Sequence, residues 1–109
     1  SRAGKRAQMI PVRIGDDIQS ARRAGKLRDV VLRIHTSGAV KGDVLVVTFN
    51  DARSMASVNS DENRIDVPLH PRAVQQGVNQ LTLSIGCRAD SAKKPLAIEQ
   101  VRVDVRYRT

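Results

Sequence analysis

The sequence contains few of the residues that form catalytic centres or flat stacking surfaces. Its 109 residues include one cysteine, two histidines, one tyrosine, one phenylalanine and no tryptophan. A single cysteine excludes an internal disulfide and a zinc site built from several cysteines. No apolar run approaches the ~18 residues that a membrane span requires. We therefore expect a protein that is not an enzyme and that has no membrane partner.

The nucleophilic side chains lack the partners that catalysis requires. Ser84 is preceded by Leu83 and not by the glycine of a nucleophile elbow. Cys87 has only His35 and His70 as potential bases, and a lone cysteine more often serves packing. These residues predict no active site, and we expect Cys87 to pack at the end of a strand.

Positive charge dominates the chain, which has a formal net charge of +8. Residues 1–54 carry 11 basic and 5 acidic side chains, whereas residues 55–109 carry 8 and 6. Such a surplus raises polyanions as partners, but the scarcity of aromatic side chains for base stacking argues against nucleic acid. We expect residues 1–8 to form a flexible basic arm and residues 9–109 to form one domain. Because the chain begins at Ser1 without Met, we expect this domain to be a module of a larger protein.

Apolar and polar residues alternate along most of the chain. A period of two is typical of β-strands with one buried face, and it occurs in residues 9–14, 30–35, 44–50, 64–70, 79–85 and 101–107. Before the last of these segments, Leu96 and Ile98 have the opposite parity. We therefore predict a bulge near Glu99–Gln100 that returns them to the same face. The pattern predicts an all-β fold, a two-sheet antiparallel β-sandwich of the jelly-roll type.

One short helix is predicted near residues 17–24. Asp16–Asp17 can cap its first turn, Arg22–Arg23 complement the dipole at its end, and Gly25 can adopt the left-handed conformation after it. Two adjacent aspartates could also belong to a calcium site. The agreement of all three helix signals favours the cap.

Two further segments lack clear alternation. Residues 51–63 are rich in Ser, Asn and Asp, and we predict a long loop with one short strand near Met55–Val58. Residues 71–76 are predicted to form a short turn that ends at Gly77, with a positive φ there. Asp61–Glu62 is an acidic pair, but calcium takes 6–8 oxygen ligands. A structural calcium ion is therefore unsupported, and we expect no metal and no cofactor.

Three segments resemble the backbone motifs of one family. Val44–Asp51 resembles a strand closed by a Leu-Asn-Gly-like turn, Val67–Leu83 contains a strand, a turn and a Gly-x-Asn-x-Leu hairpin, and Leu96–Val103 resembles a closing strand. Together they make residues 27–108 similar to the galactose-binding-domain-like jelly-roll modules, which are accessory, carbohydrate-binding-module-like domains of bacterial glycan-active enzymes. The resemblance implies a secreted or periplasmic bacterial module whose partner is a glycan or a neighbouring domain of the same polypeptide.

The resemblance also suggests where a ligand would bind, namely on the loops at one end of the sandwich. The loops after the third and fifth strands carry amide, carboxylate and guanidinium groups suited to sugar hydroxyls. These candidate ligand-binding residues are Asn50, Asp51, Arg53, Asn59 and Arg88. Because the chain lacks the Trp and Tyr platforms on which sugar rings stack, we expect an acidic glycan, held through the arginines and released by salt.

Two alternatives remain open from the sequence. The first is a purely structural or interaction domain that packs on a neighbouring catalytic domain, with Val31, Val44 and Val46 as an exposed apolar patch. The second is a non-specific binder of polyanions or nucleic acid, which would hold its ligand electrostatically on a strand face. That polyanion face would carry Arg33, His35, Arg102 and Arg106.

Overall fold

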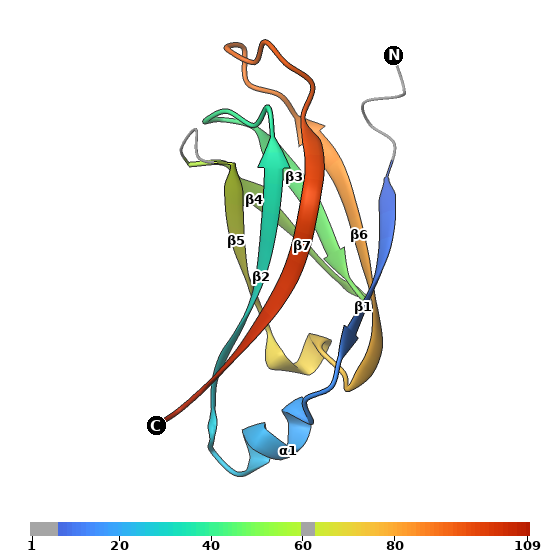
Figure 1. Ribbon diagram of the computed structural model, residues 1–109, viewed down its shortest axis with the longest axis vertical. Helices are drawn as coiled ribbons and strands as arrows, with labels where there is room; N and C mark the ends of the chain where they lie inside the picture. The colour runs from blue at the N-terminus through green and yellow to red at the C-terminus, as the bar shows by residue number, and fades with distance from the viewer. Residues whose placement is uncertain (1–6, 60–62) are drawn as a thin grey trace.

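The computed structural model describes residues 7–59 and 63–109, which form two antiparallel β-sheets that face each other (Figure 1). The four-stranded sheet has the order β1-β6-β3-β4, and the three-stranded sheet has the order β5-β2-β7. The strands are β1 Gln8–Ile14, β2 Leu27–Ser37, β3 Val44–Phe49, β4 Ala52–Ser57, β5 Arg64–Leu69, β6 Gly77–Cys87 and β7 Ala97–Tyr107. A helix, α1 Ile18–Arg23, and a 3-10 turn, η2 Pro71–Ala73, lie toward the lower end in Figure 1. The predicted all-β sandwich with one short helix is confirmed.

The core lies between the two sheets and consists of the inward-facing residues of the alternating segments. Its fully buried side chains include Val30, Leu32, Ile34, Leu45, Val47, Phe49, Leu81 and Leu83. Neighbouring residues of a strand point to opposite faces, so the alternation gathers these side chains on one side of each sheet. Each stabilises the fold by ~1.5–3 kcal/mol relative to an exposed position.

The predicted bulge in the last strand is confirmed. The residues of β2 that face it, His35–Thr36, pair with Gln100 and Ile98, so Glu99 is the extra residue. An extra residue reverses the parity of a strand. Leu96 and Ile98 therefore pack against the core on the same side as the valines of β7.

The helix begins and ends where the sequence predicts. Asp17 is the N-cap residue of α1, and its carboxylate accepts a hydrogen bond of 3.1 Å from the Ser20 N–H. Arg22–Arg23 lie in the last turn, and Gly25 follows the helix with a φ of 69°. Ile18 is fully buried and joins the core. The burial of Ile18 and the hydrogen bond to the Asp17 carboxylate therefore hold the helix in place.

Three local predictions differ from the structure. The segment after β3 is not mainly loop, because β4 pairs with β3 along its whole length although its side chains are mostly exposed. The predicted short strand near Met55–Val58 covers only the second half of β4, Ala52–Ser57, because an exposed edge strand needs no apolar alternation. Cys87 is exposed rather than packed, and Tyr107, which shares the parity of the core-facing Val101, Val103 and Val105, is nevertheless 45% exposed. Cys87 and Tyr107 are the last residues of β6 and β7. The opposite sheet no longer covers the strands at these ends.

Some predicted features lie outside the described residues. These are residues 1–6 of the expected basic arm and the Asp61–Glu62 pair. Gln8, which was expected in the arm, is the first residue of β1. Within the segments that the structure describes, no helix has the length and hydropathy needed to cross a membrane.

Candidate functional site

The five predicted ligand-binding residues do not gather at one end of the sandwich. Asn50 and Asp51 form the turn between β3 and β4, and Arg53 follows in β4. Asn59 comes after the opposite end of β4, and Arg88 follows β6 beside the first residue of β3. Successive strands of a hairpin run in opposite directions, so the loops before and after β4 lie at opposite ends. We call the end with α1 and η2 the lower end and the other the upper end (Figure 1).

Arg88 has a structural position at the upper end. Its Nε lies 3.2 Å from Oδ1 of the fully buried Asp43, and its two terminal nitrogens donate to loop carbonyls at 2.9 and 3.0 Å. Asp43 also accepts hydrogen bonds from the N–H groups of Ala89 and Val40. Burial raises the pKa of Asp43, but these hydrogen bonds and the Arg88 ion pair outweigh it and leave the pKa below the ordinary value. Arg88 therefore holds loops of the upper end together. The other predicted ligand-binding residue at this end, Asn59, is exposed.

Asn50 also uses its side chain within the protein. It has a φ of 54°, in the left-handed region that asparagine tolerates better than most residues. Its Nδ2 donates to the Ala73 carbonyl at 2.7 Å and to Asn79 Oδ1 at 2.9 Å, and its Oδ1 accepts from the Gln80 N–H at 2.9 Å. The buried Asn79 bonds in turn to the N–H and the carbonyl of Gln75. This network joins the β3–β4 turn to η2 and β6.

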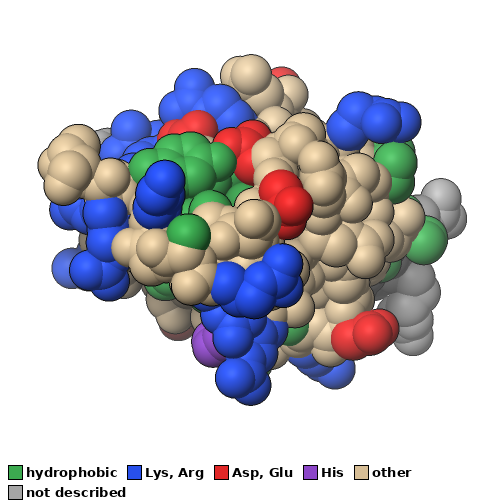
Figure 2. Space-filling model, turned by 90° about the horizontal axis from the view of Figure 1, so that it is seen from below, with side chains coloured by type: hydrophobic (Ala, Val, Ile, Leu, Met, Phe, Trp, Pro, Cys, Tyr) green, Lys and Arg blue, Asp and Glu red, His purple; other side chains and the backbone are tan. Residues whose placement is uncertain are grey.

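An open cleft of about 840 Å³ lies between the β3–β4 turn and η2. Its size falls within the ~300–1,000 Å³ typical of small-molecule sites. The lining includes the polar residues Asn50, Asp51, His70, Arg72, Gln75 and Gln80. Figure 2, which views the molecule from below, shows Lys and Arg side chains gathered along the left and lower parts of this end. We refer to this feature as the lower-end cleft.

Several polar groups of the lower-end cleft have no partner within the described part of the chain. They are the Asp51 carboxylate, the Arg72 guanidinium and the Gln80 carboxamide. The Nδ1 of His70 accepts a hydrogen bond of 3.1 Å from the Arg72 N–H, so the neutral ring carries its proton on Nε2. The cleft thus offers a cation, an anion and neutral donors and acceptors, which together can bind hydroxyl groups and a carboxylate.

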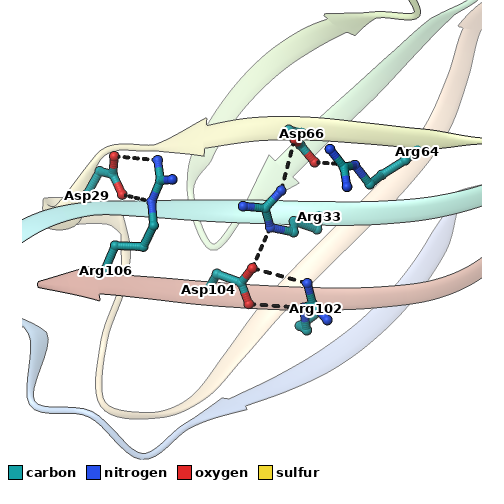
Figure 3. Close-up of polar contacts among 7 residues, drawn as sticks. All are labelled: Asp29, Arg33, Arg64, Asp66, Arg102, Asp104 and Arg106. Atoms are coloured by element: carbon teal, nitrogen blue, oxygen red, sulfur yellow. Dashed lines mark hydrogen bonds and ion pairs between the residues drawn. The ribbon is translucent and has the colours of Figure 1, made fainter. Parts of the chain in front are cut away.

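The outer face of the three-stranded sheet carries a network of ion pairs (Figure 3). Arg33 of the central strand lies between two aspartates, with Nη1 3.0 Å from Asp66 and Nε in contact with Asp104. Arg64 pairs with the first of them at 3.4 Å and Arg102 with the second at 3.0 Å. The hydrogen bond from Arg33 is the main reason that the pKa of Asp104 lies below its ordinary value.

The residues of the predicted polyanion face lie together on this sheet, but their charges are largely balanced. Arg106 donates two hydrogen bonds to Asp29, at 2.6 and 2.7 Å. These bonds lower the pKa of Asp29 and raise the pKa of Arg106. Arg33 and Arg102 form ion pairs with Asp104. His35 lies opposite Arg64 in the register of β2 and β5. Four arginines thus face three aspartates in Figure 3, so the face attracts polyanions less than its arginines alone would suggest.

The predicted apolar patch is not exposed. Val31 is only 8% exposed although it lies on the outer face, and Val44 and Val46 are half-buried. Arg33 and Arg106 line the shallow pocket that contains Val31. Long arginine side chains can cover an apolar neighbour with their methylene groups while the charged ends stay paired in water, which accounts for the low exposure of Val31.

Metal-ligating residues are scattered. The described segments contain no cluster of three or more His, Cys, Asp or Glu side chains that could hold a metal ion. Asp17 caps α1, and Asp16 accepts a hydrogen bond from the Tyr107 hydroxyl. This hydrogen bond raises the pKa of Tyr107. Both aspartates that could suggest calcium therefore have partners within the protein.

Three residues of the lower-end cleft, His70, Arg72 and Gln80, were not among the predicted ligand-binding residues. The His-Pro sequence signals the start of η2, but only the fold brings this turn against the β3–β4 turn. Comparison of the chain with protein-family models, curated proteins and solved structures found no match. A functional proposal therefore rests on the geometry of this cleft and on the ion-pair face.

Proposed function

We propose that this chain is a non-catalytic β-sandwich module that binds an acidic glycan in the lower-end cleft. The observation that carries the proposal is a set of polar groups around one open cleft of about 840 Å³ that have no partner among the described residues, namely the side chains of Asp51, Arg72 and Gln80 and the Nε2 of His70. The resemblance to galactose-binding-like accessory modules supports the same class of ligand. It also supports a secreted or periplasmic bacterial parent enzyme, which we include in the proposal.

Each group has a role in this proposal. The guanidinium of Arg72 pairs with a sugar carboxylate, since its planar N–H groups match a carboxylate in two-point geometry. The carboxylate of Asp51 and the amide of Gln80 bond to neighbouring hydroxyls, and Nε2–H of His70 donates to a ring or hydroxyl oxygen. No Trp, Tyr or Phe side chain is among the described residues that line the cleft, so a neutral sugar would bind weakly.

The surrounding structure supports the proposal by keeping the cleft rigid. Asn50 and Asn79 connect the two walls through hydrogen bonds of 2.7 to 2.9 Å. A ligand therefore need not order these turns when it binds, which preserves more of the interaction energy for affinity. In this proposal Asn50 is a positioning residue, whereas Asp51 and Arg72 contact the ligand.

Calorimetric titration with a galacturonic acid oligosaccharide and with the matching galactose oligosaccharide tests the proposal, because the two differ only at the carboxylate. We expect binding of the acidic sugar alone, weakened by raising the salt concentration. Loss of a hydrogen bond to a charged group predicts that Arg72→Ala weakens binding about tenfold or more. Arg64→Ala, on the outer face of the other sheet, is the matched control and should bind normally. No binding of either sugar, or normal binding by the Arg72 variant, would refute the proposal.

The second candidate function is that of an interaction domain. It is favoured by a groove at the open side of the sandwich, between β1 and β7, whose lining includes valine and isoleucine side chains of both strands. Binding of polyanions at the outer face is the third candidate, and the aspartates paired with Arg33, Arg102 and Arg106 weaken it.

A further inference from the structure

The two sheets differ in width, and this leaves a strand-sized space at one side. Sheet β1-β6-β3-β4 has one strand more than sheet β5-β2-β7. In Figure 1, β1 lies at the right margin, beyond every strand of the smaller sheet. A groove of about 400 Å³ lies there, lined on one side by β1 and on the other by β7. We call it the edge groove.

Apolar residues from both sheets line the edge groove. Its walls include Ile10 and Val12 of β1 and Val101, Val103 and Val105 of β7. These five side chains pack against the core but remain only half-buried. Fully burying such a side chain would stabilise a complex by the hydrophobic effect. A segment that paired with β7 as a fourth strand would cover these half-buried side chains.

As an edge strand, β7 also has backbone groups facing the edge groove that no other described strand pairs with. Thr36 of β2 donates its N–H to Asn63, on the β5 side. The N–H and carbonyl groups of successive residues in a strand point to opposite sides. Arg33, three residues before Thr36, therefore directs these groups toward β7, where it pairs with Arg102. The residues on either side of Arg102, Val101 and Val103, consequently direct their N–H and carbonyl groups away from β2. The same alternation applies to Val105.

Prolines distinguish this edge from two others. Pro11 lies in β1 and Pro68 in β5, which are both edge strands. Proline has no N–H, and at an edge it hinders the addition of another strand. β7 contains no proline over its 11 residues, Ala97–Tyr107. Of the two strands that border the edge groove, one is therefore blocked and the other is open to pairing.

We propose that the edge groove binds an extended segment of a partner polypeptide, which pairs with β7 as the fourth strand of the smaller sheet. Charge indicates the chemistry of this segment. Its inward residues would be apolar, to fill the space beneath Ile10 and Val12. Its outward residues would lie beside Arg102 and Arg106, whose side chains remain 56% and 43% exposed although they pair with Asp104 and Asp29. Acidic residues at these two positions and a neutral residue beside Asp104 complement the edge.

The geometry disfavours a second copy of this chain as the occupant. Two copies that paired β7 with β7 would be related by a twofold axis perpendicular to the sheet. Because β1 extends past β7, the β1 strands of both copies would then compete for the same space above the new pair. A single extended segment avoids this collision. The hydrogen bond between Tyr107 and Asp16 connects the two walls at the end of β7, and it limits the length of the segment at that end.

A peptide with the core Glu-Val-Thr-Val-Glu tests the proposal, because this core is symmetric and suits either strand direction. Its glutamates would face Arg102 and Arg106, and its threonine would face Asp104. Amide hydrogen exchange measured by NMR should slow at least about tenfold at Val101, Val103 and Val105 when the peptide is saturating. A peptide with lysine in place of glutamate should bind about fivefold more weakly, from the loss of two cross-strand ion pairs.

Two controls distinguish backbone pairing with β7 from non-specific binding of the peptide to the groove. The same peptide with N-methyl groups on its pairing amides cannot form the ladder and should not protect β7, and this control leaves the protein unchanged. Val103→Pro should abolish binding because it removes a groove-facing N–H, whereas Val103→Ile should retain it. Equal binding of the N-methylated peptide, an absence of protection on β7, or concentration-dependent dimers held through β7 would overturn the proposal. Arg72→Ala should bind the peptide normally, so the result is independent of the proposed glycan site.

Discussion

The buried carboxylate of Asp43 and the partly exposed guanidinium of Arg88 form an ion pair that joins the loops of the upper end, with Arg88 Nε 3.2 Å from Asp43 Oδ1. Arg88 was predicted to contact a ligand because it follows a strand and carries a charge. The structure shows instead that its charge is matched by a carboxylate with no exposed surface. A charged loop residue is available to a ligand only if the fold leaves it without an internal partner, and Arg72 meets this condition in the described residues.

The substitution Asp43→Asn should destabilise the protein by about 2–3 kcal/mol, because it leaves Arg88 without its counterion and weakens two loop hydrogen bonds. Urea denaturation monitored by circular dichroism measures this change. Arg64→Gln, which breaks an exposed ion pair of 3.4 Å, should change stability by less than about 1 kcal/mol. A similar small loss in both variants would contradict the structural role of Asp43.

The low pKa of Asp43 also predicts how stability depends on pH. A carboxyl whose pKa is lower in the folded than in the unfolded protein stabilises the fold above the unfolded value of ~3.9. That contribution is lost as the pH falls through the lower, folded-state value. Acid unfolding of the wild type and of Asp43→Asn should therefore differ, with the stability gap between them narrowing below about pH 4. A gap that stays constant from neutral to acid pH would show that the carboxylate charge is unimportant.

Two glycines with similar φ values provide a matched pair for backbone strain. Gly25 has a φ of 69° and open space around it, whereas Gly38 has a φ of 76° and a methyl group there would collide with the Pro95 carbonyl. We expect Gly25→Ala to cost about 1–2 kcal/mol from the left-handed conformation alone. Gly38→Ala should cost at least about 1 kcal/mol more, since a clash with backbone is added to the same strain. Thermal unfolding of both variants would reveal the difference, and equal losses would contradict it.

Two substitutions of Asn50 separate the stability contributed by its side-chain hydrogen bonds from the cost of its positive φ. Asn50→Gly keeps the positive φ but loses the bonds to Ala73, Asn79 and Gln80, and should cost about 1–2 kcal/mol. Asn50→Ala loses the same bonds and adds the strain of a left-handed alanine, so it should cost about 1 kcal/mol more. Chemical denaturation compares the two variants. Both should also weaken the proposed glycan binding, because Asn50 positions the cleft walls.

The carboxyl of Asp104 should titrate differently when Arg33 is removed. The hydrogen bond from Arg33 is the first cause of its low pKa, so Arg33→Gln should raise the pKa of Asp104 toward the ordinary value. Carbon-detected NMR titration of the aspartate carboxyls measures this directly. Substitution of Arg64, which contacts Asp66 and not Asp104, should leave the Asp104 titration nearly unchanged.

The strands and the helix could be predicted because their causes are local. Alternation placed Leu45, Val47 and Phe49 on one face, and the change of parity between Ile98 and Val101 required the bulge that the structure has at Glu99. The cap at Asp17 followed from a side chain and a backbone N–H three residues apart. β4 escaped prediction as a full strand because its pairing depends on the neighbouring strand and not on its own side chains.

The binding features depend on distances between segments that are remote in the chain. Asn50 meets Asn79, and Arg33 meets Asp66 and Asp104, only after the sheets have formed. Whether a charged or amide side chain is occupied or free is therefore decided by tertiary packing, and the same holds for the unequal sheet widths that leave β7 open. The alternation that decides which face of a strand is buried extends over only a few residues, so it can be recognised in the sequence. Electrostatic and hydrogen-bond partners are chosen across space, where one sequence alone does not indicate which groups will meet.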